Sequence, residues 1–234
     1  MARMAAGRTT QLSADEIARE LVRLFDESDG EPSIRALASA LHVSPRAIYH
    51  YFDTRQELVA AALDLVWEEA IAHIVEQIAD PVHDIGDPVE FFVVVALATR
   101  RAFARHRRLA LHVGVAGGPN SRLAGAIAII GSALEQVGLT GDDAGRAVYA
   151  YTTFVLGSVM LDASRWSAEQ GSHLPLAGFS SRDLMPADAP EVEDATVDAI
   201  DGVLAGSQGD ASANDERFAA GVRALLRGFI DAAG

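Results

Sequence analysis

Two short helical patterns near the N-terminus are separated by a turn of only three residues, and this spacing leaves few ways for the chain to fold. The first begins at Ser33, and its apolar residues recur at helical spacing: Ile34, Leu37, Ala38 and Leu41. The second begins at Ser44-Pro45, a capping residue followed by proline at the first helical position, and turns Ile48 and Phe52 inward. Two short helices joined so closely form a helix-turn-helix.

Longer helical patterns flank this motif. Ser13 and Glu16 form a capping-box pattern at the start of a helix that ends near Gly30, and Thr54 and Glu57 repeat it at the start of a helix that continues to residue 79. Further helical patterns follow along the chain at residues 88–108, 121–138, 142–169 and 215–232, and residues 191–206 can hold a short helix. No segment alternates with period two, so we predict an all-α protein.

The helical patterns divide the chain into a small N-terminal part and a larger C-terminal part. We expect a flexible arm at residues 1–12, a three-helix domain with the helix-turn-helix at residues 13–58, and a helical body at residues 59–234. Within the body, segments rich in Gly, Ser and Pro predict a loop at residues 170–190 and a mobile linker at residues 207–214.

Composition narrows the class of protein. The chain has 234 residues, of which 50% are hydrophobic, enough to fill a core, and it has no cysteine, which excludes disulfides and thiolate metal sites. No apolar run is long enough for a signal peptide or a membrane span, so we expect a cytoplasmic protein without a membrane partner. The formal net charge of -14 opposes binding to nucleic acid, but residues 33–55 carry three arginines against one aspartate. Any DNA-binding face is therefore small and basic on an acidic body.

Several sequence pieces stand in one register between Ile34 and Leu58. They are a leucine-alanine pair, a Leu-x-Val-Ser turn, an Ile-Tyr-x-Tyr-Phe run and an Arg-x-Glu-Leu segment. This set resembles the DNA-binding domain of the TetR (tetracycline repressor) family, and residues 216–228 resemble the last helix of its C-terminal domain. The sequence departs from the family pattern at His42, where glycine is usual, and at Arg55, where lysine is usual. Histidine can adopt a left-handed turn, and arginine keeps the charge that binds phosphate.

The resemblance implies a DNA-binding transcriptional regulator that responds to a ligand, and in particular a repressor that a small molecule releases from its operator. It implies a homodimer, a palindromic double-stranded DNA operator, and a small-molecule effector that the sequence does not identify. The helical body would then serve both ligand binding and dimerisation. We expect no cofactor and no metal site.

The residues that we expect on the DNA-binding face lie in or beside the helix-turn-helix: Arg35, Ser44, Pro45, Arg46, Ala47, Tyr49, His50, Tyr51 and Arg55. Arg46 suits a bidentate contact to guanine, and its alternatives are a phosphate contact or a solvated surface position. The family pattern suggests that Tyr49 reaches phosphate or bases, against the alternative of half-buried packing. Arg55, at a helix start, can share a phosphate with backbone amides, or it can pair with Asp53 or Glu57.

Two apolar stripes in the C-terminal half are interpreted as a dimer interface, because one small DNA-binding domain covers too few base pairs for operator affinity. The residues assigned to the interface are Tyr151, Phe154, Phe218, Val222, Leu225 and Phe229. The alternative is that both helices lie in the core of one protomer. Mixed polar and aromatic residues within apolar helices are candidates for an effector pocket, or else ordinary core or surface residues: His73, His112, Tyr151 and Trp166.

Two other classes of function remain as alternatives. The sequence contains no H-E-x-x-H, G-x-S-x-G or phosphate-binding P-loop motif and no cysteine nucleophile, so we expect that it is not an enzyme. The second alternative is a protein-interaction module that keeps the fold without binding DNA, which the overall acidity favours. Salt-dependent DNA binding would discriminate between that module and a regulator.

Overall fold

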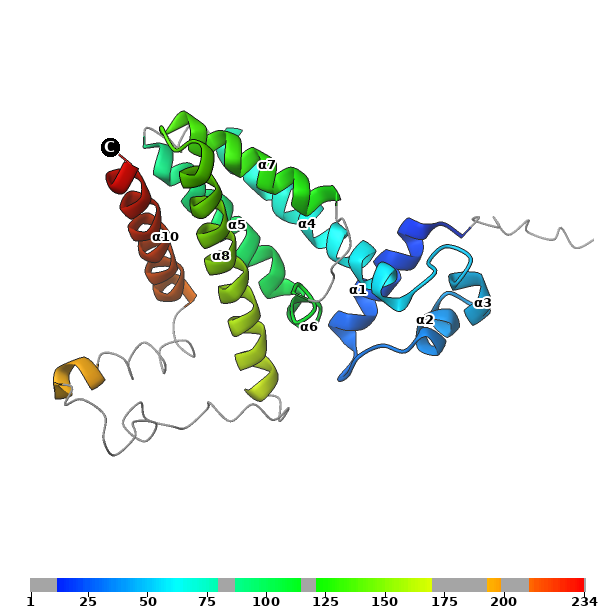
Figure 1. Ribbon diagram of the computed structural model, residues 1–234. Coiled ribbons are helices and arrows are strands. Elements are labelled where there is room, and N and C mark those ends of the chain that lie inside the picture. Colours follow the sequence, from blue (N-terminus) through cyan, green and yellow to red (C-terminus); the bar gives the residue numbers. More distant parts are fainter. Residues whose placement is uncertain (1–11, 80–86, 115–120, 170–192, 199–210, 234) are drawn as a thin grey trace, which may run out of the picture.

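The computed structural model describes residues 12–79, 87–114, 121–169, 193–198 and 211–233 of the chain. Within these ranges the protein is helical and contains no strand. Three helices form a small head at one end of the elongated molecule (Figure 1): α1 (Ala14–Glu27), α2 (Ile34–Ala40) and α3 (Pro45–Ile48). Helix α4 (Arg55–Ala79) begins in this head and runs into the body.

Side-chain caps fix the starts of the helices in the head. At α1 the Ser13 hydroxyl accepts from the Glu16 backbone N–H at 3.2 Å, and the Ser13 N–H donates to the Glu16 carboxylate at 3.1 Å. Ser33 and Ser44 cap α2 and α3 through the N–H groups three residues later, at 3.1 and 3.3 Å. These bonds satisfy amides that have no partner inside the helix, which is why serine at these positions defines the boundaries.

The turn between α2 and α3 depends on an unusual backbone conformation. His42 has a φ of +54°, which lies in the left-handed region. The sequence predicts this conformation, because His42 stands at a turn position where glycine is usual. Helix α3 is shorter than the sequence pattern suggests: it ends at Ile48, and a hydrogen-bonded turn through Tyr51 continues it, with the Tyr51 N–H donating to the Ile48 carbonyl at 3.0 Å. Ile48 and Phe52 both point into the core, as the pattern predicts.

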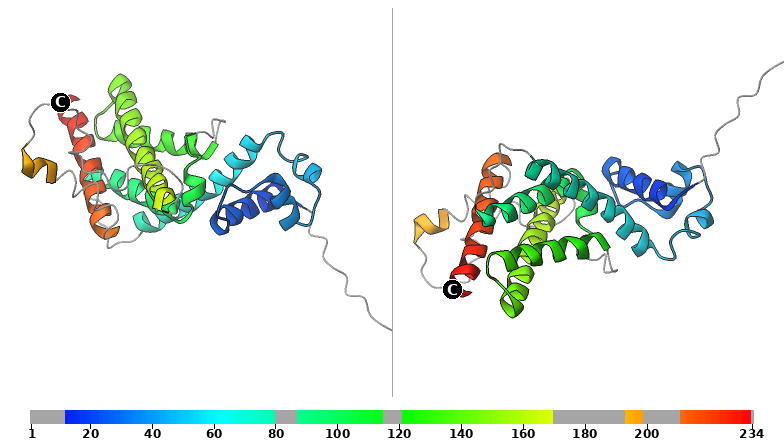
Figure 2. Two further views of the ribbon diagram at one scale, coloured as in Figure 1. Left: turned by 90° about the horizontal axis from the view of Figure 1, so that it is seen from below. Right: turned by 90° about the horizontal axis from the view of Figure 1, so that it is seen from above.

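The body is built from α5 (Pro88–Arg105), α6 (Arg107–Ala110), α7 (Ser121–Gln136), α8 (Gly141–Glu169) and α10 (Ala211–Ala233), with a further helical turn at residues 194–198. Helix α5 packs against α4, α8 and α10. The two further views in Figure 2 show α8 and α10 side by side at the end of the molecule away from α1 to α3. None of the described helices combines the length and the apolar character needed to cross a bilayer.

Helix boundaries in the body differ from the sequence prediction at His106 and at the start of the last helix. The single helix predicted at residues 88–108 is divided at His106, whose φ of -114° and ψ of 51° are not helical. The last helix begins at Ala211, so residues 211–214 of the predicted linker are helical. Residues 207–210 of that linker, the predicted loop at 170–190 and residues 1–11 of the predicted arm lie outside the described residues.

His106 joins the head to the body. Its Nδ1 lies 2.9 Å from the Asp26 carboxylate of α1, and its Nε2 lies 3.0 Å from the Glu69 carboxylate of α4, which Arg105 also contacts. An imidazole that faces two carboxylates donates through both nitrogens only when it is protonated. Hydrogen bonding to Asp26, with a further contribution from Glu69, accordingly raises the pKa of His106 above its ordinary value despite partial burial.

His106→Gln is expected to lower the free energy of unfolding by about 1 kcal/mol at pH 6, because glutamine lacks the charge that both carboxylates contact. A raised folded-state pKa means that this contribution is fully present below the unfolded value of about 6.5 and is lost as pH rises through the folded value. Urea unfolding at pH 6 and pH 9 measures it: the difference between wild type and variant should shrink at pH 9. His73→Gln, at an exposed histidine on α4, is the control and should show little effect. A difference that does not depend on pH would contradict the assignment.

Candidate nucleic-acid interface and ligand cavity

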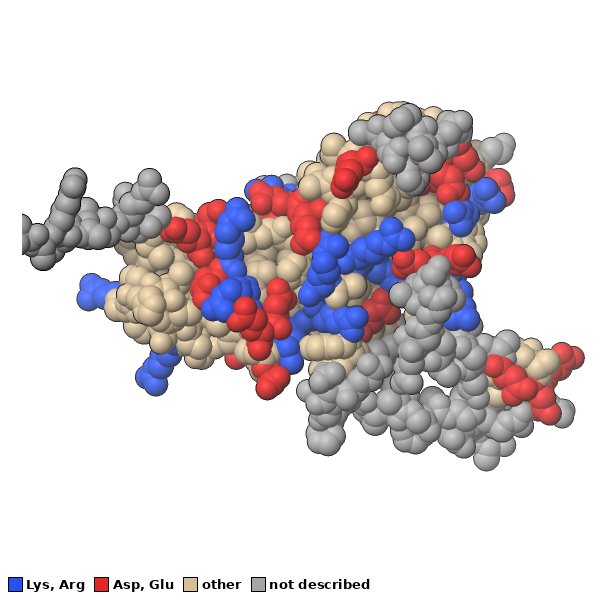
Figure 3. Space-filling view, turned by 180° about the vertical axis from the view of Figure 1, so that it is seen from behind, with Lys and Arg blue, Asp and Glu red and all other residues tan. Residues whose placement is uncertain are grey.

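The residues that the sequence assigns to DNA binding gather at the far end of the head. Seven are exposed, namely Arg35, Ser44, Pro45, Arg46, Tyr49, His50 and Tyr51, and Ala47 and Arg55 are half-buried. In the view of Figure 3, basic side chains project from the end of the head, and acidic and basic side chains are interspersed over the rest of the visible face. Most of the predicted residues are therefore exposed on the helix-turn-helix.

The three arginines of this surface differ in their partners. Arg35 and Arg46 form no ion pair with any residue that the structure describes. Arg55 donates to the Glu31 carboxylate at 2.7 Å and to the Pro32 carbonyl at 2.7 Å, so it pairs with the end of the α1–α2 connection rather than with either predicted partner. The hydrogen bond from Arg55 in turn holds the pKa of Glu31 below its ordinary value. Arg35 and Arg46 are free to contact a ligand, whereas the guanidinium of Arg55 already pairs with the Glu31 carboxylate.

The polar side chains between these arginines are also not equivalent. Tyr51 donates its hydroxyl to the Leu12 carbonyl, and its ring meets His50 edge-on with centroids 5.5 Å apart. Ser44 is occupied as the α3 cap. Tyr49 is 48% exposed, and its hydroxyl has no hydrogen-bond partner among the described residues. Among the hydroxyl groups that we expect at the DNA, that of Tyr49 is therefore the one without a hydrogen bond to the described residues, so it can still bond to DNA.

The predicted dimer interface requires a correction. Tyr151, Phe218 and Val222 are 2%, 7% and 0% exposed and belong to the protomer's own core, so they are wrong as surface residues. Tyr151 donates its hydroxyl to the Phe92 carbonyl at 2.8 Å, and burial raises the pKa of this phenol. Leu225 and Phe229 are partly buried against the same core, while Phe154 is 36% exposed. The helical spacing of apolar residues identifies the buried face of a helix, but it does not tell whether the same chain or a second copy covers that face.

A different face of α8 is exposed and mostly apolar. Its residues recur at helical spacing: Tyr149, Thr153, Phe154, Gly157 and Leu161. Phe154 stacks on Phe218 of α10 at 5.4 Å, and a Cβ added at Gly221 would lie only 2.7 Å from the Phe154 ring. The absence of a side chain at Gly221 thus lets α10 approach α8 closely beneath this face.

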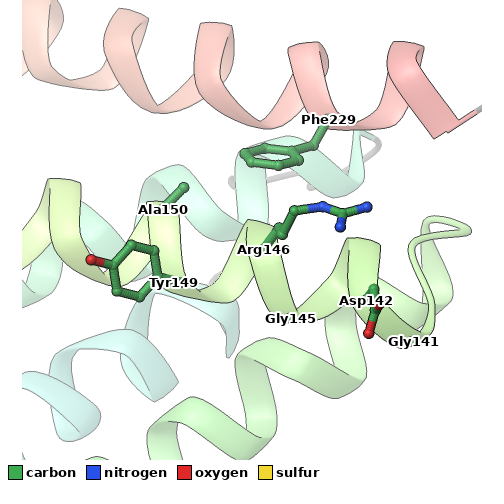
Figure 4. Close-up of a pocket in the computed structure, with 7 residues that line it drawn as sticks. All are labelled: Gly141, Asp142, Gly145, Arg146, Tyr149, Ala150 and Phe229. Carbon is green, nitrogen blue, oxygen red and sulfur yellow. The ribbon is translucent and has the colours of Figure 1, made fainter.

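An open groove continues the exposed face of α8 toward α10. Figure 4 shows the Phe229 ring reaching from α10 toward the α8 residues that line the groove. The lining residues are Gly141, Asp142, Gly145, Arg146, Tyr149, Ala150 and Phe229. Because Phe229 contributes to this groove, it is the α10 member of the predicted interface that reaches the surface.

A small apolar cavity lies inside the body, between α4, α5, α7 and α8. Its volume is about 40 Å³. The lining residues are Trp67, Ala70, Ile71, Ile74, Val95, Thr99, Leu123, Ala126, Ile127, Ile130, Tyr151, Thr152, Val155 and Leu156. No charged side chain is among them, and the described residues contain no cluster of three or more metal-ligating side chains.

Of the four predicted effector residues, the structure places only Tyr151 at this cavity. His73 lies beside Glu76 at 3.6 Å, His112 contacts the Phe25 ring, and Trp166 packs under the guanidinium groups of Arg107 and Arg108, so none of these three lines this cavity. Trp67, Thr99 and Thr152 line the cavity and are not among the predicted residues. An isolated hydroxyl within an otherwise apolar helical stripe is the sequence signal that could have identified the two threonines.

Solved structures share this fold over most of the chain. A possible TetR family transcriptional regulator from Streptomyces coelicolor A3(2) is 25% identical, with 92% of this chain and 98% of that chain covered and a TM-score of 0.67. ActR from Streptomyces coelicolor, in complex with (S)-DNPA, is 20% identical, with 95% and 99% covered and a TM-score of 0.62. BioQ with its natural double-stranded DNA operator is 23% identical, with 69% and 94% covered and a TM-score of 0.56.

The sequence comparison places the family signal in the head. The family described as bacterial regulatory proteins, tetR family, matches residues 22–62, which run from within α1 through the helix-turn-helix into α4. No curated protein matches the chain. The matched segment and the helix-turn-helix geometry coincide, and the fold of the whole chain is that of TetR-family structures, so the two comparisons together support a DNA-binding transcriptional regulator of the TetR type; the proteins that the chain resembles are transcriptional regulators and not enzymes.

Proposed function

We propose that the protein is a homodimeric repressor that binds a palindromic operator and is released from it by a small molecule bound in the body. One observation carries this proposal: a single helix, α4, contributes to both the head core and the cavity. Leu58 and Leu63 are buried in the core that α4 shares with the head, and Trp67, Ala70 and Ile74 line the cavity. A ligand that displaces α4 would therefore act on the orientation of the head.

The DNA-binding face is proposed to enter the major groove with α3. In a helix-turn-helix the N-terminal residues of the second helix lie nearest the base edges. Arg46 occupies that position, is exposed and has no ion-pair partner among the described residues, so it suits a bidentate contact to guanine. The remaining proposed contacts to backbone or bases are Arg35, Ser44, Pro45, Ala47, Tyr49, His50, Tyr51 and Arg55. In this proposal residues 13–58 bind DNA, and residues 59–234 bind the effector and form the dimer.

The dimer is proposed to form through the exposed face of α8 and the adjoining groove. Two heads are needed to cover two half-sites, and a two-fold axis places the same surface of each copy against the other. Tyr149 is 74% exposed and Leu161 is 43% exposed, and pairing of two such faces removes their apolar surface from water. Phe154, which is exposed, and Phe229, which lines the groove, stay in the proposed interface, and Leu225 is half-buried on α10.

The experiment that tests this function is a salt titration of arginine variants on operator and random DNA. Arg46→Ala is expected to weaken operator binding by about 1 to 3 kcal/mol per half-site and to relax selectivity at one base position. Arg55→Ala should weaken binding to both DNAs and lower the salt slope by roughly one unit for each phosphate that Arg55 neutralises. Operator fragments for the assay come from selection of bound genomic DNA.

Arg101→Ala is the matched control, because Arg101 is an exposed arginine that lies on α5 in the body. It should leave both affinities and the salt slope unchanged. If neither Arg46→Ala nor Arg55→Ala alters binding to either DNA, the proposed face is wrong, and a protein-interaction module becomes the better explanation of the exposed arginines.

A further inference from the structure

The cavity between α4, α5, α7 and α8 contains one hydroxyl without a partner. The Thr152 Oγ1 is buried and makes no hydrogen bond with the described residues. Its polar neighbours are satisfied: Thr99 donates to the Val95 carbonyl at 2.9 Å, and Tyr151 donates to the Phe92 carbonyl at 2.8 Å. A buried hydroxyl without a hydrogen bond is unfavourable, so the unliganded cavity has an unsatisfied hydrogen-bonding group at Thr152.

The rest of the lining excludes a charged ligand. Its other members are aliphatic or aromatic apart from these hydroxyls and the Trp67 indole, and no acidic or basic side chain faces the space. An ion placed here would give up its hydration without gaining an opposite charge, which disfavours binding strongly. A neutral molecule has no such cost, and its apolar part gains from burial against residues such as Ile71 and Ile127.

We propose that the effector is a neutral, mostly apolar molecule with a single hydrogen-bonding group that pairs with the Thr152 hydroxyl. This inference rests on the proposed function, since it names the ligand class of the same cavity. Thr152 sets the orientation of the molecule, and the apolar walls contributed by four helices provide most of the binding.

The cavity must widen to hold such a molecule. A volume of about 40 Å³ is far below the 300 to 1,000 Å³ of typical ligand sites. Helix α7 is the wall best suited to move, because its main contacts are only with α8 and α4 and its cavity residues Leu123, Ala126 and Ile127 are half-buried. Outward movement of α7 enlarges the cavity while α5 and α8 stay packed against α10.

The inference is tested with four probes of matched size: cyclohexanol, methylcyclohexane, cyclohexanecarboxylate and cyclohexylammonium. The full chain with Trp166→Phe is used, because Trp67 in the cavity wall is then the only tryptophan and its fluorescence reports binding. Cyclohexanol is expected to bind at least about 10-fold more tightly than either ion, since only the ions must be desolvated without a partner. Equal affinity for an ion, or no binding by any of the four, overturns the proposal.

Thr152→Val removes the hydroxyl and keeps the shape of the side chain. It should weaken cyclohexanol binding about 10-fold, leave methylcyclohexane binding unchanged and raise the Tm of the unliganded protein, because the unpaired hydroxyl is gone. Thr196→Val, at an exposed threonine that lies neither at the cavity nor on the exposed face of α8, is the control and should change none of these. A Thr152→Val variant that binds both probes equally weakly, or that has a lower unliganded Tm, overturns the role of the hydroxyl.

Operator binding separates this inference from the function on which it rests. Cyclohexanol at saturation should lower operator affinity about 5- to 150-fold, the usual range of coupling between two sites. If cyclohexanol binds in a Thr152-dependent way but leaves operator affinity unchanged, the proposed effector role is wrong and the proposed ligand class stands. If cyclohexanecarboxylate binds in this cavity and releases the protein from the operator, the regulatory function stands and the proposed ligand class is wrong.

Discussion

Gly157→Arg is expected to convert the proposed dimer into a folded monomer and to weaken operator binding by about 100-fold or more, the contribution of the second linked half-site. Gly157 is exposed on α8, and a Cβ at this position meets nothing within 4 Å, so the protomer itself tolerates the larger side chain. Two copies paired through α8 would instead bring an arginine from each chain into a desolvated surface. Sedimentation measures the assembly, and a gel shift measures the affinity.

Gly125→Arg provides the control for this experiment. Gly125 is also an exposed helical glycine with open space around it, but it lies on α7 rather than on α8. Both substitutions replace glycine with a better helix former, so neither should reduce the stability of the protomer. A wild-type protein that sediments as a monomer at micromolar concentration, or a Gly157→Arg variant that remains a dimer, would place the interface elsewhere.

Arg100→Met is expected to lower the free energy of unfolding by about 2 to 3 kcal/mol, because it leaves two partly buried carboxylates without their shared cation. Arg100 lies on α5, is 13% exposed, and contacts Asp162 of α8 at 2.7 Å and Asp215 of α10 at 3.1 Å. Its guanidinium also lies over the Phe218 ring at 5.0 Å. Thermal unfolding should show a decrease in Tm of about 4 to 12 °C for a chain of this length.

The neighbouring Arg101 supplies the comparison for Arg100→Met. Its one ion pair with the part of the chain that the structure describes is to Asp215, at 2.8 Å, and its side chain is 50% exposed, so solvent already weakens that pair. Arg101→Met should cost less than about 1 kcal/mol. Equal decreases in stability for the two substitutions would mean that the connection between α5, α8 and α10 depends on packing and not on the buried charge of Arg100.

Local features of the head can be predicted from sequence because each depends on atoms a few residues apart. Ser13, Ser33 and Ser44 cap helices through amides three residues later, and His42 occupies a turn position whose backbone conformation the neighbouring helices dictate. The all-α class follows in the same way from the spacing of apolar residues. None of these predictions depends on what the helices pack against.

Contacts between distant segments cannot be predicted in this way. Periodicity identifies the apolar face of α10 but cannot tell that α5 and α8 of the same chain cover Phe218 and Val222. The alternative to a phosphate contact at Arg55 is a pairing with the nearby Asp53 or Glu57, yet Arg55 pairs with Glu31, 24 residues earlier. The chemistry of a side chain alone does not place it at a cavity, and His112 and Trp166 lie at the junction with the head instead.

The length of α4 has a mechanical consequence. From Leu58 in the shared core to Ile74 at the cavity the helix spans about 24 Å, at 1.5 Å per residue. A rigid rod of that length that tilts by about 5° moves its far end by about 2 Å, and a hydrogen bond breaks when donor and acceptor separate by less than this. In the proposed regulator, a ligand that tilts α4 by this small angle would therefore move the head far enough to break a contact between α3 and a base.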